Sequence, residues 1–349
     1  MALHKGLDQE DFRFISGQPL PWDKLRDKSI LITGGNGLIA SAFIDALMQC
    51  EAAVERNVSV TVLCRSEEKA KQRFGEYAGN PRFSLLVQDV CQPLPPQTVF
   101  DFILHAASPS HPLAFSNTPV DVMKANFIGT MQMLESARLH GSRLLYLSSG
   151  EIYGPNPDGM EAMPETYPGM VPPMQPRSCY PEGKRAAETL CASYEKQYGT
   201  DALAARLCYV YGASITEDNS RADAQFLRNV LRGEDIVMKS AGTQLRTYCY
   251  LADCITGLLF ILLLGEKGEA YNIANRHSIV SIREYAGTLA EAAGVSLRFE
   301  NPSDQEKAGY STSGRSVLDG SKLEELGWKP KWNIRDGLFK MYRLSKGRG

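Results

Sequence analysis

The amino-acid sequence predicts an α/β protein with a doubly wound parallel sheet and a smaller α/β region toward the C-terminus. Three observations support this fold class. Short apolar runs typical of buried strands alternate with stretches of helical periodicity between residues 29 and 148. The first run leads into a glycine-rich turn and then into a helical stretch. At 349 residues, the chain is long enough for one large domain or two.

The expected elements follow this pattern in chain order. Strands are expected at residues 29–33, 58–63, 83–88, 100–105 and 143–148, and helices at 38–50, 66–74 and 119–140. Farther along, we expect a helix at 179–198, a strand at 202–208, helices at 221–232 and 251–264, a strand at 270–274 and a final helical region. Such alternation builds a parallel sheet with right-handed crossovers, and ligands bind at its carboxyl edge.

Two segments do not follow the alternation. Residues 1–28 are polar and aromatic, and we interpret them as an N-terminal extension that packs either on the sheet or on a neighbouring subunit. Residues 154–181 contain eight prolines and four methionines and show little periodicity. A loop of this length is usually functional, so we expect an active-site lid; a surface excursion fixed by proline is the alternative.

Composition excludes several classes of function. Forty acidic and 38 basic residues leave a net charge of −2 without a basic tract, so we expect no nucleic-acid partner. The eight cysteines show no CxxC or disulfide-framework spacing, which indicates reduced thiols, and no metal site, in a cytoplasmic protein. No signal-peptide pattern opens the chain, and the longest apolar stretch, 255–264, is far shorter than the ~20 residues of a membrane span. We therefore expect no membrane partner.

The turn after the first strand has the residues of a dinucleotide-binding site. Gly34 allows a tight turn, and Gly37 lets the backbone approach a pyrophosphate at the N-terminus of the following helix. Ala40 stands where a third glycine is usual, which only slightly loosens the packing of the helix on the strand. The context of strand, turn and helix makes a Rossmann-like sheet the specific prediction. The expected cofactor contacts in this turn are Gly34, Asn36, Gly37, Leu38 and Ile39.

Tyr180 and Lys184 are the main candidates for catalysis. They are four residues apart at the start of a helical run, so both side chains lie on one face of the helix. An ammonium near a phenol favours the phenolate, which would lower the tyrosine pKa from about 10 and make Tyr180 a general base for a hydroxyl group. Ser149, at a strand end, can hydrogen-bond the same substrate oxygen. The spacing alone is more typical of a surface pair, but the glycine turn upstream favours catalysis.

Together these residues resemble the extended short-chain dehydrogenase/reductase family, and the resemblance covers nearly the whole chain. The family's cofactor turn is similar to Thr33-Gly34-x-x-Gly37-x-x-Ala40, and its catalytic-serine strand is similar to Ser-Ser-Gly-Glu-Ile-Tyr-Gly at residues 148–154. The resemblance implies further cofactor contacts along the sheet edge and in the helix that follows. These are Asp89, Val90, His105, Ala106, Ala107, Ser108 and Asn126, besides Tyr180 and Lys184.

The resemblance also implies how the chain is divided and assembled. It implies a cofactor-binding Rossmann domain at 29–200 and a region at 201–349 that mainly binds a nucleotide sugar, with some segments returning to the sheet. It further implies a homodimer formed through two helices of each subunit. The apolar faces of 119–140 and 179–198 would serve, although these faces are equally consistent with core packing.

Within this family the chain most resembles the UDP-glucuronate decarboxylases. It shares with them the pattern Arg-x-Cys-Tyr-x-Glu-Gly-Lys-Arg-x-Ala-Glu-x-x-Cys, which starts at Arg177. Where the family's 4,6-dehydratases have an Asp-Glu pair whose aspartate expels the 6-hydroxyl, this chain has Gly150 and Glu151. Loss of carbon dioxide from a 4-keto uronic acid needs no such acid, because the carbonyl accepts the electrons. Glu151 is expected to orient the substrate carboxylate or a proton-donating water.

Three arginines, Arg221, Arg246 and Arg315, match arginines of the family. The resemblance implies that they bind the diphosphate and carboxylate of the substrate, because guanidinium groups suit such oxygens. One of them, Arg315, is expected to hold the sugar against rotation. In the segment from Arg206 to Ala213, the asparagine with which the family holds the diphosphate is missing, which leaves the identity of the substrate open. The expected substrate contacts are Ser108, Ser149, Gly150, Glu151, Tyr180, Tyr209, Arg221, Arg246 and Arg315.

The second strand ends without the acid that usually binds the adenosine 2′-hydroxyl of NAD. Arg65 stands at this end instead and would accept a 2′-phosphate, so NADP is the alternative cofactor. We expect NAD, because enzymes that recycle a retained cofactor mostly use it.

The leading hypothesis is an enzyme that oxidises C4 of a UDP-linked uronic acid, releases carbon dioxide and returns the hydride. The nearest alternative is a 4-epimerase of UDP-uronic acids or UDP-sugars. A 4,6-dehydratase and an NADPH-dependent nucleotide-sugar reductase are further enzymatic alternatives. A non-catalytic sensor of nucleotide sugars is the alternative from another class of protein.

Overall fold

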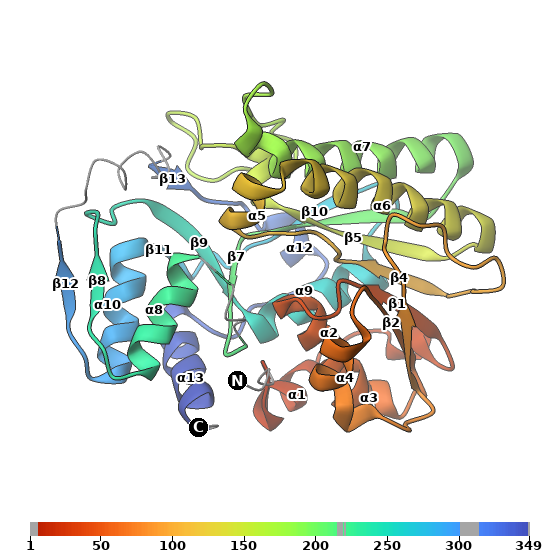
Figure 1. Ribbon diagram of the computed structural model, residues 1–349, viewed down its shortest axis with the longest axis horizontal. Helices are drawn as coiled ribbons and strands as arrows, with labels where there is room; N and C mark the ends of the chain where they lie inside the picture. Colours follow the sequence, from red (N-terminus) through yellow and green to blue (C-terminus); the bar gives the residue numbers. More distant parts are fainter. Residues whose placement is uncertain (1–5, 215–218, 220, 301–313, 348–349) are drawn as a thin grey trace.

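The centre of the protein is a seven-stranded parallel sheet. The computed structural model describes residues 6–214, 219, 221–300 and 314–347, and the sheet within them has the order β10-β6-β5-β4-β1-β2-β3 (Figure 1). The predicted doubly wound parallel sheet is therefore confirmed. Its strands are β1 (Ser29–Thr33), β2 (Ser59–Cys64), β3 (Phe83–Val87), β4 (Phe102–His105), β5 (Arg143–Ser149), β6 (Ala202–Leu207) and β10 (Ala270–Ile273).

Helices cover both faces of this sheet. α6 (Pro119–His140) and α7 (Cys179–Tyr198) pack against each other over one face, and α2 (Leu38–Gln49) and α9 (Leu251–Leu264) lie over the other (Figure 1). Successive strand side chains point to opposite faces. In β1, for example, Ile30 and Ile32 belong to the core under α2 and α9, whereas Leu31 belongs to the core under α6 and α7. Burial on both faces explains the continuous apolar runs of the strands.

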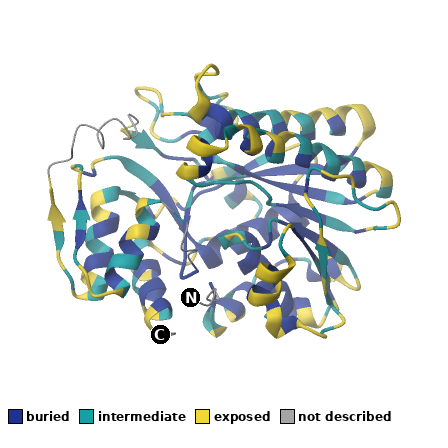
Figure 2. Cartoon of the chain, in the orientation of Figure 1, coloured by how far each residue is buried: buried dark blue, intermediate teal, exposed yellow. Residues whose placement is uncertain are grey.

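A second region of the structure lies beside the carboxyl edge of the sheet and contains the helices α8, α10 and α13 (Figure 1). Figure 2 shows that these helices bury their inner faces and expose their outer ones. In this region β9 pairs with β7, β11 and β13, and β8 pairs with β12. The bounds are β7 (Tyr209–Tyr211), α8 (Ala222–Leu231), β8 (Ile236–Met238), β9 (Leu245–Tyr250), β11 (Ile279–Ser281), α10 (Ile282–Ala293), β12 (Leu297–Phe299), β13 (Arg315–Ser316) and α13 (Ile334–Lys346).

Every strand and helix expected from the sequence is present, with ends displaced by at most two residues. Several short elements were not anticipated, because three residues of strand are too few to show a period. α10 was also missed, although Ser281 and Glu284 form a capping box at its start. The remaining elements are α1 (Gln9–Ser16), η1 (Trp22–Leu25), α3 (Glu51–Val54), α4 (Glu67–Phe74), η2 (Gly75–Tyr77), α5 (Pro112–Asn117), η3 (Gly150–Tyr153), η4 (Pro176–Ser178) and α12 (Ser321–Glu325).

None of the helices within the described ranges is both long and apolar enough to cross a bilayer.

The N-terminal extension packs on helices of its own chain, and its residues 1–5 lie outside the described part. α1 contacts α3 and α9 and reaches the second region through a buried lysine on α13. The Nζ atom of Lys340 lies 3.0 Å from Asp8, 2.8 Å from Glu10 and 3.1 Å from Asp11. We call these four residues the Lys340 cluster. Because α1 rests on α9 and the cluster reaches α13, the cluster joins the central sheet to the second region.

Replacement of Lys340 by methionine is expected to destabilise the protein. The Lys340 side chain is 2% exposed and Asp11 is fully buried, so the variant leaves a buried carboxylate without its cation. Breaking such a pair typically costs ~3–5 kcal/mol, and we expect a loss of about 3 kcal/mol in the free energy of unfolding, because Asp8 and Glu10 remain partly hydrated. Denaturant titration measures this loss. Lys346→Met, which changes an exposed lysine of the same helix, is the control. Equal midpoints for the two variants would contradict the role of the cluster.

Candidate active site

The residues expected to bind cofactor and substrate follow the carboxyl ends of the central strands. The glycine turn follows β1, Asp89 follows β3, His105 ends β4 and Ser149 ends β5. The strand order places β1, β4 and β5 side by side, so the turn, His105 and Ser149 share one edge of the sheet (Figure 1). The order of neighbouring strands reverses between β1 and β4, which is where such sheets bind ligands.

The glycine turn has a shape that only glycine allows at its first position. Gly34 has φ +67°, and a Cβ atom there would lie 2.8 Å from the backbone of Ala107. Gly37 is exposed and caps α2 without a side-chain hydrogen bond, which leaves the first N–H groups of the helix available. Asn36 Oδ1 is buried and has no hydrogen-bond partner among the described residues. A ligand with a pyrophosphate and ribose hydroxyls fits this turn, because it offers acceptors to the N–H groups and a donor to Asn36.

Thr33 and His105 hold the turn to the next strand. The Thr33 hydroxyl lies 2.7 Å from His105 Nδ1 and accepts hydrogen bonds from the N–H groups of Ala106 and Ala107. On the other side of the ring, Nε2 lies 3.1 Å from the Thr130 hydroxyl. Burial lowers the pKa of His105 to about 3, with help from the charge of Lys184, so the ring is neutral. His105 therefore supports the cofactor segment from inside the protein.

This network fixes the tautomer of His105 and reaches Asn126. Because the Thr33 hydroxyl already accepts two bonds, its proton goes to Nδ1, and Nε2 carries the ring proton. The Thr130 hydroxyl accepts a hydrogen bond from this Nε2–H group and donates one to the backbone carbonyl of Asn126 at 2.5 Å. The Asn126 amide is buried: it donates to Val122 and accepts from the Tyr146 hydroxyl at 3.1 Å. Asn126 thus acts on the site through Tyr146.

Tyr180 and Lys184 lie together on α7 and are both buried. Lys184 Nζ donates to the Leu147 carbonyl at 2.5 Å and lies 5.7 Å from the centre of the Tyr180 ring and 4.6 Å from that of Tyr146. Burial lowers the pKa of Lys184 to about 7. Burial and the charge of Glu151 raise the pKa of Tyr180 to about 12. The expected depression of the tyrosine pKa is therefore wrong for the chain alone, because desolvation is the largest influence on the phenol.

Ser149 and Gly150 lie where β5 ends, next to Tyr180. The Ser149 hydroxyl accepts a hydrogen bond from the Glu151 N–H at 3.2 Å, and its bond to Tyr180 counteracts part of the rise in the tyrosine pKa. A Cβ atom on Gly150 would lie 2.9 Å from both methyl carbons of Leu318. A side chain at position 150 would therefore displace the end of the Leu318 side chain, which enters from the second region.

Four charged side chains surround the hydroxyl of Tyr180 and the neighbouring ring of Tyr209. Arg177 Nη2 lies 2.8 Å from Glu151 Oε2, and Arg221 donates to the Ser110 carbonyl at 2.8 Å. The Arg246 guanidinium stacks 4.4 Å from the centre of the Tyr209 ring. Glu151 and Arg221 act on the pKa of both tyrosines. The structure therefore brings together Ser149, Glu151, Tyr180, Tyr209, Arg221 and Arg246. It adds Arg177, which the Arg-x-Cys-Tyr motif already contained.

Arg315 was expected to hold the sugar, but its side chain hydrogen-bonds the loop before α7. Its Nε donates to the Glu161 carbonyl at 2.7 Å, in the loop before α7. β13 pairs with β9 so that Ser316 faces Arg246, and Ser316 also hydrogen-bonds Tyr209. Because neighbouring strand residues point to opposite faces, Ser316 lies on the side of Tyr209 and Arg315 lies on the side of the loop.

The loop expected to be a lid, residues 154–181, is joined to the rest of the protein by backbone hydrogen bonds, and its last three residues already belong to α7. Met170 bonds Tyr153, and Met163 bonds Val317 and Asp319. Met170 and Met174 are nevertheless 74% and 95% exposed. The loop is therefore anchored at its base and exposed at these two methionines.

The expected adenosine contacts lie beyond β2 and β3. Asp89 is exposed and accepts a hydrogen bond from the Cys91 N–H at 2.8 Å, and its charge and that of Arg65 both act on the Cys91 thiol. Arg65 and Asp89 are thus neighbours. The other expected contacts line the edge between these residues and Ser149: Leu38, Ile39, Ala106, Ala107 and Ser108 are partly buried and Val90 is buried.

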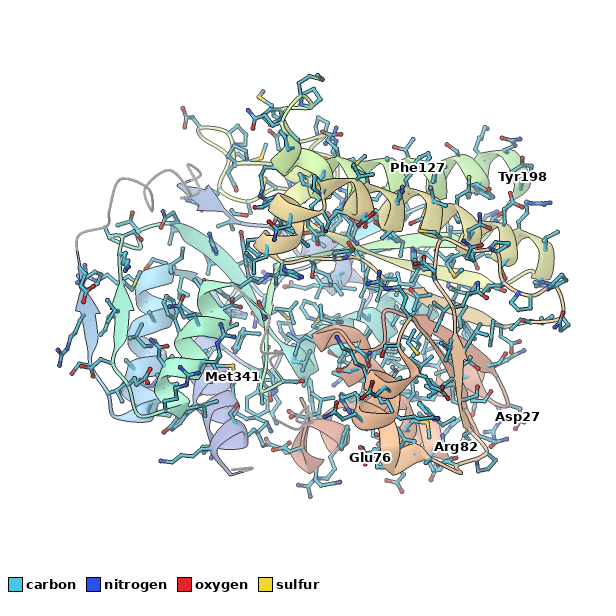
Figure 3. All side chains as sticks on the ribbon, in the orientation of Figure 1. Asp27, Glu76, Arg82, Phe127, Tyr198 and Met341 are labelled. Atoms are coloured by element: carbon cyan, nitrogen blue, oxygen red, sulfur yellow. The ribbon has the colours of Figure 1, made fainter. Side chains whose placement is uncertain are left out.

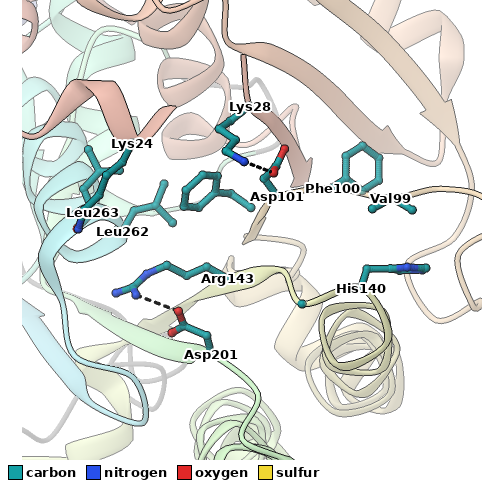
Figure 4. A pocket seen from close by; sticks show the side chains of 12 residues that line it. Lys24, Lys28, Val99, Phe100, Asp101, His140, Arg143, Asp201, Leu262 and Leu263 are labelled. Atoms are coloured by element: carbon teal, nitrogen blue, oxygen red, sulfur yellow. Dashed lines mark hydrogen bonds and ion pairs between the residues drawn. The ribbon is translucent and has the colours of Figure 1, made fainter. Parts of the chain in front are cut away.

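A separate cavity of about 420 Å³ lies at the opposite edge of the sheet (Figure 4). It is lined at the amino ends of β4 and β5 by the ion pairs Lys28–Asp101 and Arg143–Asp201, with His140 beside them. Parallel sheets bind their ligands at the carboxyl edge, so this cavity is not the candidate active site.

Comparison with known proteins agrees with this geometry. The NAD dependent epimerase/dehydratase family matches residues 30–274. UDP-glucuronic acid decarboxylase 3 of Arabidopsis thaliana is 36% identical over 313 residues, which are 88% of this chain and 86% of that protein. UDP-glucuronic acid decarboxylase 1 of Xenopus tropicalis is 33% identical over 316 residues, which are 90% of this chain and 71% of that protein.

Among solved structures, the UDP-glucuronic acid 4-epimerase of Bacillus cereus, in complex with NAD and a substrate analogue, superposes with a TM-score of 0.77. The two are 22% identical over 92% of this chain and all of that one, so this likeness concerns the fold. The family match spans more than half of the sequence and the relatives align over most of its length, and we conclude that the chain belongs to the NAD dependent epimerase/dehydratase family.

Proposed function

We propose that this protein is a UDP-glucuronate decarboxylase that uses a bound NAD. The proposal rests on the residues around Tyr180. Ser149 and Glu151 lie beside Tyr180, and position 150 carries glycine where a dehydratase would need an acid. The relatives named as UDP-glucuronic acid decarboxylases, at 31–36% identity, support the same reaction.

The glycine turn, Asp89 and the segment after β4 would hold the cofactor. When bound, oxidised nicotinamide accepts the hydride from C4 of the sugar, returns it after decarboxylation, and adds a positive charge to the site. Lys184 would exchange the Leu147 carbonyl for a ribose hydroxyl, which keeps its ammonium beside Tyr180. Arg65 beside Asp89 leaves NADP as the alternative cofactor.

Tyr180 would take the proton of the C4 hydroxyl as the hydride leaves. Its pKa of about 12 in the chain alone means that the phenolate needs added positive charge. Lys184, Arg221 and Arg177 are nearby cations of the chain. Loss of carbon dioxide places negative charge on the C4 oxygen, where Tyr180 and Ser149 can donate hydrogen bonds. Glu151 lies close enough to guide a proton to C5 through water. Arg246 and Arg221 would bind the diphosphate.

The second candidate is a UDP-uronic acid 4-epimerase, because the B. cereus epimerase shares the fold and epimerisation also needs only Tyr180 and Ser149. Dehydration is disfavoured, since position 150 carries glycine and the acid that dehydration requires is missing there. An NADPH-dependent nucleotide-sugar reductase would consume its cofactor, and a non-catalytic sensor of nucleotide sugars would convert no substrate.

We also propose a cytoplasmic homodimer that forms through α6 and α7. Val120 and Phe127 are seven residues apart on α6, so they lie on one face, and they are 63% and 41% exposed. Tyr198 at the end of α7 is 50% exposed. Figure 3 shows Phe127 and Tyr198 on the outer side of these helices. Exposed apolar side chains on neighbouring helices are typical of an interface.

Purified protein incubated with UDP-glucuronate and no added cofactor is expected to release carbon dioxide and form UDP-xylose. The retained cofactor should be neither consumed nor accumulated in reduced form. Mass spectrometry of the products, with absorbance of the bound cofactor, measures both. Interconversion of two uronic acids without carbon dioxide would contradict the proposal and favour the epimerase, and stoichiometric oxidation of added NADPH would favour the reductase.

Tyr180→Phe is expected to lower kcat by roughly 10²–10⁴-fold, because it removes the general base and keeps the ring. Steady-state kinetics measures the effect, and circular dichroism checks that the fold is intact. Tyr194→Phe on the same helix, where the hydroxyl bonds Glu135, is the control. A Tyr180→Phe enzyme within threefold of the wild type would remove Tyr180 from the mechanism.

Phe127→Glu is expected to convert the dimer to a monomer, since a charge placed in an apolar interface must be desolvated. Sedimentation velocity gives the mass of the wild type and the variant. A monomeric wild-type protein, or a variant that stays dimeric, would show that this face is not the interface.

A further inference from the structure

An ion pair between Glu151 and Arg177 lies beside Tyr180. Glu151 belongs to η3, just after β5, and Arg177 belongs to η4, just before α7. Their side chains are 31% and 55% exposed, so solvent and ligands reach both. The charges of both also act on the Tyr180 phenol, in opposite directions. A sugar whose hydroxyl meets Tyr180 therefore meets this pair as well.

Arg177 is held in place by a second contact that does not involve Glu151. Its guanidinium carbon lies 4.5 Å from the centre of the Phe115 ring, and that ring lies 4.8 Å from the ring of Tyr180. A guanidinium over an aromatic face is attracted by the ring quadrupole. Phe115 is 3% exposed, so its ring is a fixed support. Arg177 would therefore keep its position if another carboxylate replaced that of Glu151.

The two other arginines near Tyr180 and Tyr209 have partners of another kind. Arg221 donates to the carbonyl of Ser110, and Arg246 stacks on Tyr209. In the part of the chain that the structure describes, Arg177 is the one of the three that is paired with a carboxylate. Exposed ion pairs are weak, and a guanidinium fork binds a carboxylate with two hydrogen bonds. A carboxylate on a ligand can therefore take the place of Glu151.

We propose that Arg177 is a specificity-determining residue that binds the C5 carboxylate of the substrate in exchange for Glu151. The inference rests on the proposed function, since it takes the substrate to be a uronic acid. The exchange releases Glu151 beside Tyr180 only when a uronic acid is bound. A neutral hexose has no carboxylate that can replace Glu151, so the ion pair between Glu151 and Arg177 stays formed.

The chemistry of decarboxylation sets the kinetic signature of this contact. The substrate carboxylate loses its negative charge as carbon dioxide leaves, so the attraction of Arg177 is stronger before the reaction than in the transition state. An interaction of this kind contributes to binding and does not speed the chemical step. Loss of Arg177 should therefore raise KM and leave kcat unchanged or slightly higher.

Calorimetric titration of the Tyr180→Phe protein, with its copurified cofactor, tests the proposal with UDP-glucuronate and with UDP-xylose, which lacks the carboxylate. This background is used for every variant below, because its slow turnover preserves UDP-glucuronate during the titration. Arg177→Gln is expected to weaken UDP-glucuronate binding about tenfold to hundredfold, the range of one charge-assisted contact. UDP-xylose binding should change less than about twofold, within the spread of a surface substitution. Arg335→Gln is the matched control, because Arg335 is 57% exposed and pairs with Glu291 on the second region.

Glu151→Gln provides the reciprocal test. Because it removes the internal competitor for Arg177, it should tighten the binding of UDP-glucuronate and leave that of UDP-xylose unchanged. Equal losses for both ligands in Arg177→Gln would assign the arginine to the diphosphate and overturn the inference, as would unchanged UDP-glucuronate binding in either variant. A wild-type protein that binds UDP-xylose but not UDP-glucuronate would instead refute the proposed function.

Discussion

A chain of buried, hydrogen-bonded residues connects the glycine turn with α7, the helix that carries Tyr180 and Lys184. It begins at Thr33, at the end of the first strand, and passes through His105 and Thr130 to Asn126 and Tyr146. The ring of Tyr146 lies under Lys184, so the chain ends at α7, the helix that carries Tyr180 and Lys184. Thr33 donates to His105 and His105 donates to Thr130, which requires a neutral His105. Thr130 donates to the backbone carbonyl of Asn126, and Tyr146 donates to the side-chain oxygen of Asn126. A buried network that is fully satisfied in this way makes the position of its members unique.

The second region completes the site and depends on how it is attached. It supplies Arg246 and Ser316, which contact Tyr209 of its own strand β7, and Leu318, which contacts Gly150 at the end of β5 in the central sheet. The Lys340 cluster holds the N-terminal helix to this region at a distance from the chemistry. The geometry around Tyr180 is therefore the product of two attachments: the hydrogen-bond chain inside the sheet, and the contacts between sheet and second region.

The sequence predicted the central sheet well because its signals are local. Apolar runs, the glycine turn and the spacing of Tyr180 and Lys184 each lie within a few residues. The order of the strands in the sheet was not predicted, because it depends on which distant segments pair. The sign of the Tyr180 pKa shift could not be predicted this way, because it depends on burial by segments far away in the chain. The same holds for Arg315 and Ser316, since the register of β13 on β9 decides which of the two faces Tyr209. Arg177 was within the quoted motif, but its pairing with Glu151 appears only in three dimensions.

The contact between Gly150 and Leu318 couples two positions that are more than 160 residues apart in the sequence. A Cβ atom at position 150 would lie 2.9 Å from both methyl carbons of Leu318. These methyls are the far end of a flexible side chain, so a larger residue at position 150 requires the Leu318 side chain to adopt another rotamer. Substitutions at positions 150 and 318 should therefore be non-additive, since each changes the space available to the other.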